Sequence, residues 1–267
     1  MISQIAYHIA ESSTKIHVSD DLSCVVFCEG HGPKGALFAN AVSEFQMHSL
    51  LEHPTHIFTQ TEEFLSDNLG KDVVQDGVSG TTCSYLRIEP IRNLLICANV
   101  GTSMVRAWEE PGEGVVLTTH HTVESEYNRI VRAGGKGIFY DPTGTYAKGK
   151  HRIYVNNVVQ TQNAYKRNCR GESATCVLSG DNLPLCLSRC FGSWDFPPVG
   201  VRSLPSVYKH SSKQVQAIVM GSTAFWDCMQ FRRVGDILLS PEFRNAQEAV
   251  EALHKESGHS VLVLYLS

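Results

Sequence analysis

The chain of 267 residues, 42% of them hydrophobic, is long enough to bury the core of one large domain or two small ones. Its 23 Lys and Arg against 27 Asp and Glu give a formal charge of -4, which excludes a general attraction to nucleic acid or anionic membranes. No uncharged apolar run approaches the roughly 18 residues of a membrane span. The N-terminus has no signal-peptide pattern and no glycine for myristoylation. We therefore expect a soluble, cytoplasmic protein without a membrane partner.

Nine cysteines in a chain without a secretory signal predict free thiols rather than a disulfide framework. Their number is odd, which argues against complete pairing. The two closest pairs, Cys24 with Cys28 and Cys186 with Cys190, lie in apolar segments typical of buried strands, so we expect no zinc site there. The twelve histidines are scattered and do not indicate a metal site.

The N-terminal half predicts one strand, one long helix and then a run of strands. The β-branched and apolar residues 23–27 predict a strand. Residues 34–52 follow with an apolar stripe of helical period, and Pro54 is expected to end this helix. Four more strand-like runs come next, at residues 83–88, 94–100, 103–108 and 115–118.

The C-terminal half predicts two further helices and two further strands. Thr122 is expected to cap a helix that ends at Gly134, and Ser240 with Pro241 is expected to begin another. Residues 217–220 and 261–266 predict strands. Because the strands come in groups and the helices in blocks, the order favours a layered α+β sandwich over an alternating parallel sheet.

Short motifs, most of them with glycine, recur at the predicted strand ends. In chain order they are Val-Val-Phe-Cys-Glu-Gly-His-Gly (25–32), Ser-Gly-Thr-Thr (79–82), Ala-Asn-Val-Gly-Thr-Ser (98–103), Leu-Thr-Thr-His-His (117–121), Asn-Arg-Ile-Val-Arg-Ala-Gly-Gly (128–135), Ser-Arg-Cys-Phe-Gly (188–192), Met-Gly-Ser-Thr-Ala-Phe-Trp-Asp (220–227) and Gly-His-Ser-Val (258–261). Each motif is loose, but their number and order over roughly residues 24–267 make the set specific.

This series resembles the motifs of the metal-dependent protein phosphatases of type 2C, among them Asp-Gly-His-Gly, Ala-Asn-x-Gly-Asp-Ser, Ser-Arg-Ala-Leu-Gly-Asp and Leu-Ala-Ser-Asp-Gly-Leu-Trp-Asp. The resemblance implies an α+β fold, namely an α/β/β/α sandwich of two mainly antiparallel sheets flanked by helices. We expect a single domain over residues 1–267, with a basic insertion at about residues 136–185.

The resemblance also implies where the family's chemistry would lie. In the family, acidic side chains hold two Mg or Mn ions, a bridging water becomes the nucleophile, and an arginine near the N-terminus binds the phosphate. At the first acid position this chain has Glu29, followed by Gly30 with an available carbonyl. The other acid positions are occupied by Thr102, Ser193, Thr223 and Ser257. No arginine precedes Arg87, so the phosphate-binding arginine has no counterpart.

These replacements predict the loss of the metal pair. Removing one unit charge at about 4 Å in a partly screened site forfeits on the order of 4 kcal/mol, or about three decades of affinity. We therefore expect a pseudophosphatase without a cofactor, with residual metal binding at most through Glu29 and Gly30. His31, where the family has a proton donor, is interpreted as a turn-stabilising residue, and Arg189 as part of a buried ion pair. The vestigial pocket comprises Glu29, Gly30, His31, Thr102, Ser193, Thr223 and Ser257.

The connection between Gly135 and Ser188 is much longer than in the family and is basic. Residues 136–181 carry seven Lys and Arg against three Asp and Glu, a balance of +4, which leaves -8 for the rest of the chain. Four tyrosines interleave with these bases, a composition suited to protein interfaces. Six basic residues are the candidates for partner binding: Lys148, Lys150, Arg152, Lys166, Arg167 and Arg170.

Three functions are compatible with these observations. The first is an inactive scaffold or structural component, in a cytoskeletal or signalling assembly, that binds an acidic protein partner. The second is a serine/threonine phosphatase with an altered divalent-metal site, and the third is a phosphoprotein sensor without turnover. No recognition motif for nucleic acid accompanies the basic segment, so we do not expect a nucleic-acid partner. The segment could equally be a solvated loop without a function.

Overall fold

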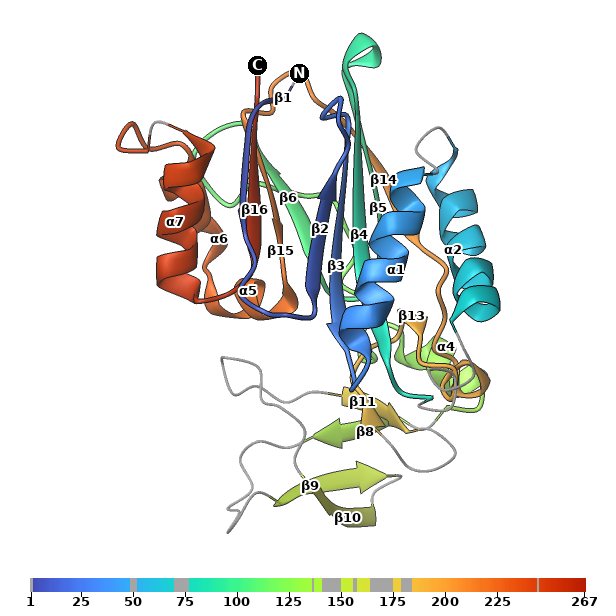
Figure 1. Cartoon of the computed structure of the whole chain (residues 1–267). Helices are drawn as coiled ribbons and strands as arrows, with labels where there is room; N and C mark the ends of the chain where they lie inside the picture. Colours follow the sequence, from blue (N-terminus) through green and yellow to red (C-terminus); the bar gives the residue numbers. More distant parts are fainter. Residues whose placement is uncertain are drawn as a thin grey trace.

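The computed structural model of the chain describes residues 2–48, 52–69, 77–135, 137–140, 150–155, 158–163, 175–178, 184–243 and 245–267. Two sheets lie face to face, with helices α1 and α2 outside one sheet and α6 and α7 outside the other (Figure 1). The expected α+β sandwich of two antiparallel sheets flanked by helices is therefore confirmed. No helix within these ranges is both long and apolar enough to cross a membrane.

The first sheet has the strand order β1-β16-β15-β6-β7, with every neighbouring pair antiparallel. Its strands are β1 (Ile2–His8), β16 (Val261–Leu266), β15 (Ala217–Gly221), β6 (Met104–Trp108) and β7 (Val115–Val116). Because β1 and β16 pair, the two ends of the described chain lie side by side in this sheet (Figure 1).

The second sheet has the order β14-β5-β4-β3-β2 and is also antiparallel. Its strands are β14 (Ser206–Ser211), β5 (Leu94–Val100), β4 (Gly80–Glu89), β3 (Cys24–His31) and β2 (Thr14–Val18), and β13 (Phe191–Gly192) pairs with the start of β4. The short helix η1 (Pro90–Arg92) joins β4 to β5.

A third, smaller antiparallel sheet lies at one end of the sandwich (Figure 1). Its strands are β8 (Gly137–Tyr140), β9 (Lys150–Val155), β10 (Val158–Asn163), β11 (Thr175–Leu178) and β12 (Pro184–Leu185). All of them fall in the long basic connection, for which only a loop or docking surface was expected.

Helices connect the strands in the described part of the chain. They are α1 (Gly35–His48), α2 (Pro54–Asn68), α4 (Tyr127–Arg132), α5 (Thr223–Cys228), α6 (Phe231–Leu238) and α7 (Ala246–Ser257), with the short helix η2 (Pro197–Val199). Pro54 was expected to end the preceding helix. It is the first residue of α2, a position at which proline is favoured.

Two predicted helix starts are wrong. The Thr122 hydroxyl oxygen accepts a hydrogen bond from the Ser125 N–H at 3.0 Å and so caps a turn, while α4 begins at Tyr127. The Ser240 hydroxyl oxygen likewise accepts from the Glu242 N–H at 3.1 Å in a turn. Helix α7 starts at Ala246 and is capped by Asn245.

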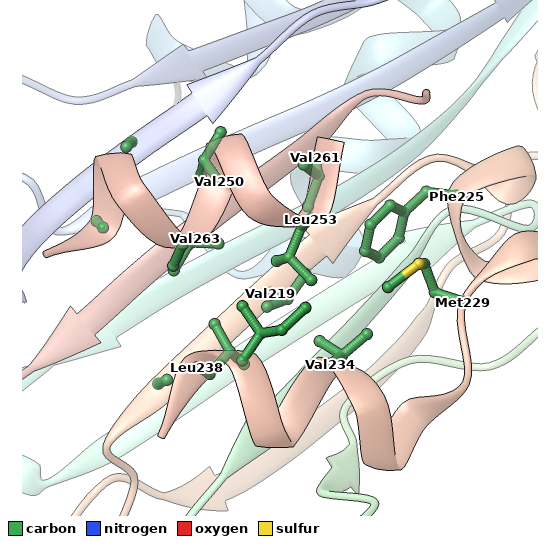
Figure 2. Packing of buried hydrophobic residues seen from close by; sticks show 14 of the residues in the cluster. Val219, Phe225, Met229, Val234, Leu238, Val250, Leu253, Val261 and Val263 are labelled. Carbon is green, nitrogen blue, oxygen red and sulfur yellow. The ribbon is translucent and has the colours of Figure 1, made fainter. Parts of the chain in front are cut away.

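The core has layers on both faces of each sheet. Strand β16 shows this clearly, because Val261 and Val263 pack under the helices whereas Leu262 and Leu264 point between the sheets. Figure 2 shows Val261 and Val263 against side chains of α5, α6 and α7. A strand buried on both faces has a continuous run of apolar residues in its sequence, which is why this strand was predicted correctly.

Most of the described cysteines are free thiols, as expected. Cys24, Cys28, Cys83, Cys97 and Cys190 are free and buried, and Cys228 is free and exposed. Cys186, however, is disulfide-bonded, so the prediction of a free thiol is wrong at this position.

Candidate functional site

Glu29 lies near the end of β3 and connects the two sheets. Its carboxylate Oε2 accepts hydrogen bonds from the backbone N–H and the hydroxyl group of Thr223, each at 2.9 Å. The Ser103 hydroxyl group donates to the same oxygen at 3.5 Å. Thr223 is the first residue of α5, so the carboxylate joins a strand of one sheet to a helix that follows the other.

Neutral hydroxyl groups surround this carboxylate. The hydroxyl oxygens of Thr102 and Thr223 lie 2.7 Å apart, and those of Thr82 and Ser103 lie 2.5 Å apart. The structure therefore brings the predicted residues Glu29, Thr102 and Thr223 together. Thr82 and Ser103 also take part, although sequence reasoning did not single them out.

A second carboxylate, that of Glu11, lies within electrostatic range of Glu29. Burial raises the pKa of the Glu29 carboxyl. The hydrogen bonds from Thr223 act to lower this pKa, and the charge on Glu11 acts to raise it. Burial also acts to raise the pKa of Glu11, but hydrogen bonds from Ser260 and His259 keep that pKa below its ordinary value. Glu11 lies in the loop between β1 and β2 and belongs to no motif, so the sequence offered no signal for it.

His31 and Ser193 form a separate contact beside the start of β4. The His31 Nε2 lies 2.8 Å from the Ser193 hydroxyl oxygen, and that hydroxyl group donates to the Val78 carbonyl at 3.0 Å. Because the hydroxyl group has one proton, it accepts from His31, whose Nε2 then carries the proton. This geometry accords with a turn-stabilising role for His31.

Gly30 is required by close packing. A Cβ atom at this position would lie 2.1 Å from the Gly35 carbonyl oxygen, at the start of α1. Its N–H donates to the Ser13 carbonyl at 3.0 Å. The glycine thus holds the end of β3 against α1.

Ser257 lies on the Glu11 side of the site, because the His259 that it contacts also contacts Glu11. Ser257 is the last residue of α7, and its hydroxyl oxygen accepts a hydrogen bond from the His259 N–H at 3.2 Å. Within the described ranges, no hydrogen bond joins Ser257 to the Glu29 cluster. Nor do three or more His, Cys, Asp or Glu side chains gather there as possible metal ligands.

Two of the six basic candidates for partner binding lie within the described residues. Lys148, Lys166, Arg167 and Arg170 lie outside the described residues. Lys150 and Arg152 belong to strand β9, which pairs with β10 and β8. Their role stays a prediction.

The predicted ion pair of Arg189 is confirmed. Its guanidinium group donates from Nε to both carboxylate oxygens of Glu126, at 3.1 and 2.9 Å. Its Nη1 donates to the Leu204 carbonyl at 2.8 Å. The side chain is 11% exposed, so the pair is largely buried.

The structure is thus an α+β sandwich of two antiparallel sheets with a polar cluster at the end of β3. The family model described as Protein phosphatase 2C matches residues 46–257, which is most of the chain. The chain belongs to the protein phosphatase 2C family. Members of this family are normally enzymes that use Mg or Mn. A search of curated proteins found no match.

Solved structures share the fold at low sequence identity. A serine-threonine phosphatase 2C from Toxoplasma gondii is 15% identical, with a TM-score of 0.68 over 98% of this chain and 94% of that one. A C. elegans sex determining protein is 15% identical, with a TM-score of 0.62 over 99% of this chain and 64% of that one. The phosphatase MsPP from Mycobacterium smegmatis is 16% identical, with a TM-score of 0.59 over 100% and 99%.

Proposed function

We propose that this chain is a catalytically inactive member of its family that acts as a protein-binding scaffold or structural component of a cytoplasmic assembly, cytoskeletal or signalling. The observation that carries the proposal is the contact between Glu29 and Thr223. At the position where the family has a metal-binding acid, the chain has a threonine that donates two hydrogen bonds to its remaining acid.

The oxygen ligands available around Glu29 do not fit two divalent ions. Mg and Mn require several hard, charged oxygen ligands. Around Glu29 one carboxylate is accompanied by the neutral hydroxyl groups of Thr102, Ser103 and Thr223, and its Oε2 already accepts two short hydrogen bonds. Replacing a carboxylate by a hydroxyl group removes a unit charge from the site, which supports the loss of metal-dependent hydrolysis.

The first arginine of the chain is also far from the position of a phosphate-binding arginine. This residue, Arg87, lies toward the other end of β4 from Thr82, which pairs with Glu29. It donates to the Glu52 carbonyl at 3.0 Å and forms an ion pair with Glu89 at 2.9 Å. This argues equally against a phosphoprotein sensor that would use the old pocket.

Calorimetric titration with manganese, alongside hydrolysis of p-nitrophenyl phosphate, tests the inactivity. We expect no micromolar manganese binding and no turnover above that of the Glu29→Ala variant, which serves as the matched blank. Micromolar binding together with turnover that disappears in Glu29→Ala would refute the proposal.

One observation favours a second candidate, a phosphatase with an altered metal site. Glu11 and Glu29 are close enough for the charge on one to raise the pKa of the other. If both hold a metal ion, manganese-dependent hydrolysis should be lost in Glu11→Gln as well as in Glu29→Ala. A Glu63→Gln variant, altered on the exposed face of α2, should retain it.

The partner part of the proposal rests on the basic insertion. An acidic protein is expected because residues 136–181 have a balance of +4 in a chain whose remainder has -8. Replacement of Lys166, Arg167 and Arg170 by Glu should abolish the capture of partners from a cytoplasmic extract. Unchanged capture by this variant would exclude the insertion as the docking surface.

A further inference from the structure

Three arginines converge on one glutamate beside α4. Glu126 precedes the helix and accepts hydrogen bonds from Arg189 and, at 2.8 Å, from the Arg129 Nη2, while the Arg202 Nη2 lies 3.5 Å from its Oε1. The Ser188 hydroxyl group donates to Glu126 at 2.8 Å. One negative charge thus faces three positive ones. We call Arg129, Arg189 and Arg202 around Glu126 the α4 arginine cluster.

Two of these arginines have structural contacts beyond Glu126. Arg189 also binds the Leu204 carbonyl, and Arg129 donates to the carbonyl oxygens of Gly200 and, at 3.0 Å, Ser188. Together they fix α4 to the chain around residues 188–204. Glu126 is the carboxylate that they share, and their hydrogen bonds hold its pKa below the ordinary value, although burial acts to raise it.

Arg202 differs from the other two. Within the described residues, the long contact with Glu126 is its sole ion pair, and its side chain is 39% exposed against 13% for Glu126. Its Nε, like that of Arg129, is withdrawn from solvent without a hydrogen-bond partner among those residues, so an incoming group can meet only its Nη atoms. Burial lowers the pKa of Arg202, and the charges of Arg189 and Arg129 lower it further, so the third arginine adds repulsion to the cluster.

The surroundings suit an incoming protein segment. A hollow of about 440 Å³ beside α4 is lined in part by Glu124, Glu126, Tyr127, Arg129 and Arg132. Arg202 does not line this hollow but contacts Glu126, which does. Tyr127 and Val131 are exposed on the same helix, at 37% and 45%. Helix α4 contacts β8, the first strand of the basic connection (Figure 1).

We propose that the α4 arginine cluster anchors an acidic segment of a protein partner, with Arg202 receiving an Asp or Glu carboxylate. A planar guanidinium group binds a carboxylate through two hydrogen bonds, and the surplus positive charge attracts the anion. A carboxylate is favoured over a phosphate because Glu124 and Glu126 line the hollow and repel a dianion more strongly. The inference rests on the proposed partner-binding function and names its contact residue.

The test uses the full chain and a fluorescein-labelled peptide of eight glutamates, with binding followed by fluorescence anisotropy. Arg202→Gln should weaken binding about tenfold, as expected for a lost hydrogen bond between charged groups. Arg233→Gln is the matched control, since it removes the same charge from an exposed arginine of α6 that pairs with Glu256. This control should change binding less than about twofold, because exposed pairs contribute little. Equal weakening in the two variants would overturn the proposal.

Two further measurements separate anchoring from other roles. Arg202→Gln should leave the thermal midpoint of unfolding unchanged or raise it, because it removes the repulsion between Arg202 and the other two arginines. A lower midpoint with unchanged peptide binding would make Arg202 a structural residue and overturn the proposal. A phosphoserine peptide of matched charge should bind more weakly than the glutamate peptide. Tighter binding that Arg202→Gln abolishes would refute the carboxylate assignment.

These outcomes are independent of the manganese and turnover measurements. If Arg202→Gln weakens peptide binding and the protein also hydrolyses p-nitrophenyl phosphate, the proposed inactivity is refuted but the role of Arg202 as an anchor stands. No Arg202 effect in a protein without turnover removes the anchor and leaves inactivity intact.

Discussion

At the scale of single residues, Glu29 and Thr223 act as one unit. Both were identified along the sequence as replacements of family acids, but their contact was not, because it joins residues from different sheets. Ser257 was grouped with them on the same grounds; it ends α7, and its hydroxyl oxygen accepts a hydrogen bond from His259, which contacts Glu11. Glu11 was missed because a loop glutamate has no signature in the sequence until the fold places it near Glu29.

The pKa of Glu29 predicts a pH dependence of stability. Because the folded state raises this pKa, the folded protein loses stability as pH rises from the unfolded value near 4.5 through the folded pKa. In urea unfolding between about pH 4 and 8, Glu29→Gln should therefore show a smaller decline in unfolding free energy than the wild type. The decline should not vanish, since burial also raises the pKa of Glu62.

Glu63→Gln, altered on the exposed face of α2, is the control for this measurement and should show the wild-type decline. If the unfolding free energy declined equally with pH in Glu29→Gln and in the wild type, the folded state would not raise the pKa of Glu29.

Thr223→Val should cost about 1–3 kcal/mol of unfolding free energy. The variant keeps the backbone N–H bond to Glu29 but leaves the carboxylate without the threonine hydroxyl group, and it also breaks the contact with Thr102. Thr59→Val, the same change on the exposed face of α2, is the comparison and should cost much less. A matching cost in both variants, measured by urea unfolding, would argue that the Thr223 hydroxyl group is not a stabilising partner of Glu29.

At the scale of elements, the cap of α7 is not the residue that the sequence predicted. Both Ser240 and Asn245 have capping side chains, and each accepts a backbone hydrogen bond. The sequence pattern favoured Ser240 because Pro241 follows it. In the structure Asn245 is the cap, and Val250 and Leu253 of the helix pack against β16 and its neighbours (Figure 2).

This difference predicts opposite outcomes for two simple variants. Asn245→Ala should cost about 1 kcal/mol of unfolding free energy, because the Glu248 N–H then loses its capping oxygen. Ser240→Ala should cost much less, since the residue supports only an exposed turn. Chemical denaturation of the two variants side by side decides between the two helix starts.

Several short elements were missed for a common reason. Strands β1 and β2 mix polar and apolar residues, and α5 and α6 are only one or two turns long. Such segments have weak local signals, and tertiary packing decides their structure. Pairing with β16 makes Ile2–His8 a strand, and packing on the first sheet stabilises Phe231–Leu238 as a helix.

At the scale of the whole molecule, the core between the sheets connects both halves of the sandwich. Leu262 is fully buried there among residues of both sheets, including Val25 and Leu86. Leu262→Ala should therefore cost about 2–5 kcal/mol. The transition should shift equally by tryptophan fluorescence and far-UV circular dichroism, because one core unfolds as a unit.

Leu22→Ala, at an exposed turn residue, is the comparison for Leu262→Ala and should shift the transition little. Two separate transitions in the Leu262 variant would contradict a single core that spans both sheets.

The sequence by itself determined the family, the two-sheet sandwich and the loss of acids at the pocket, because these depend on local patterns and motifs in a fixed order. The tertiary structure alone decided which polar groups meet. It joined Ser257 to His259, brought Glu11 within electrostatic range of Glu29, and gathered three arginines on Glu126. Contacts of this kind join residues far apart in the chain, and their energies depend on burial and distance, which no local pattern records.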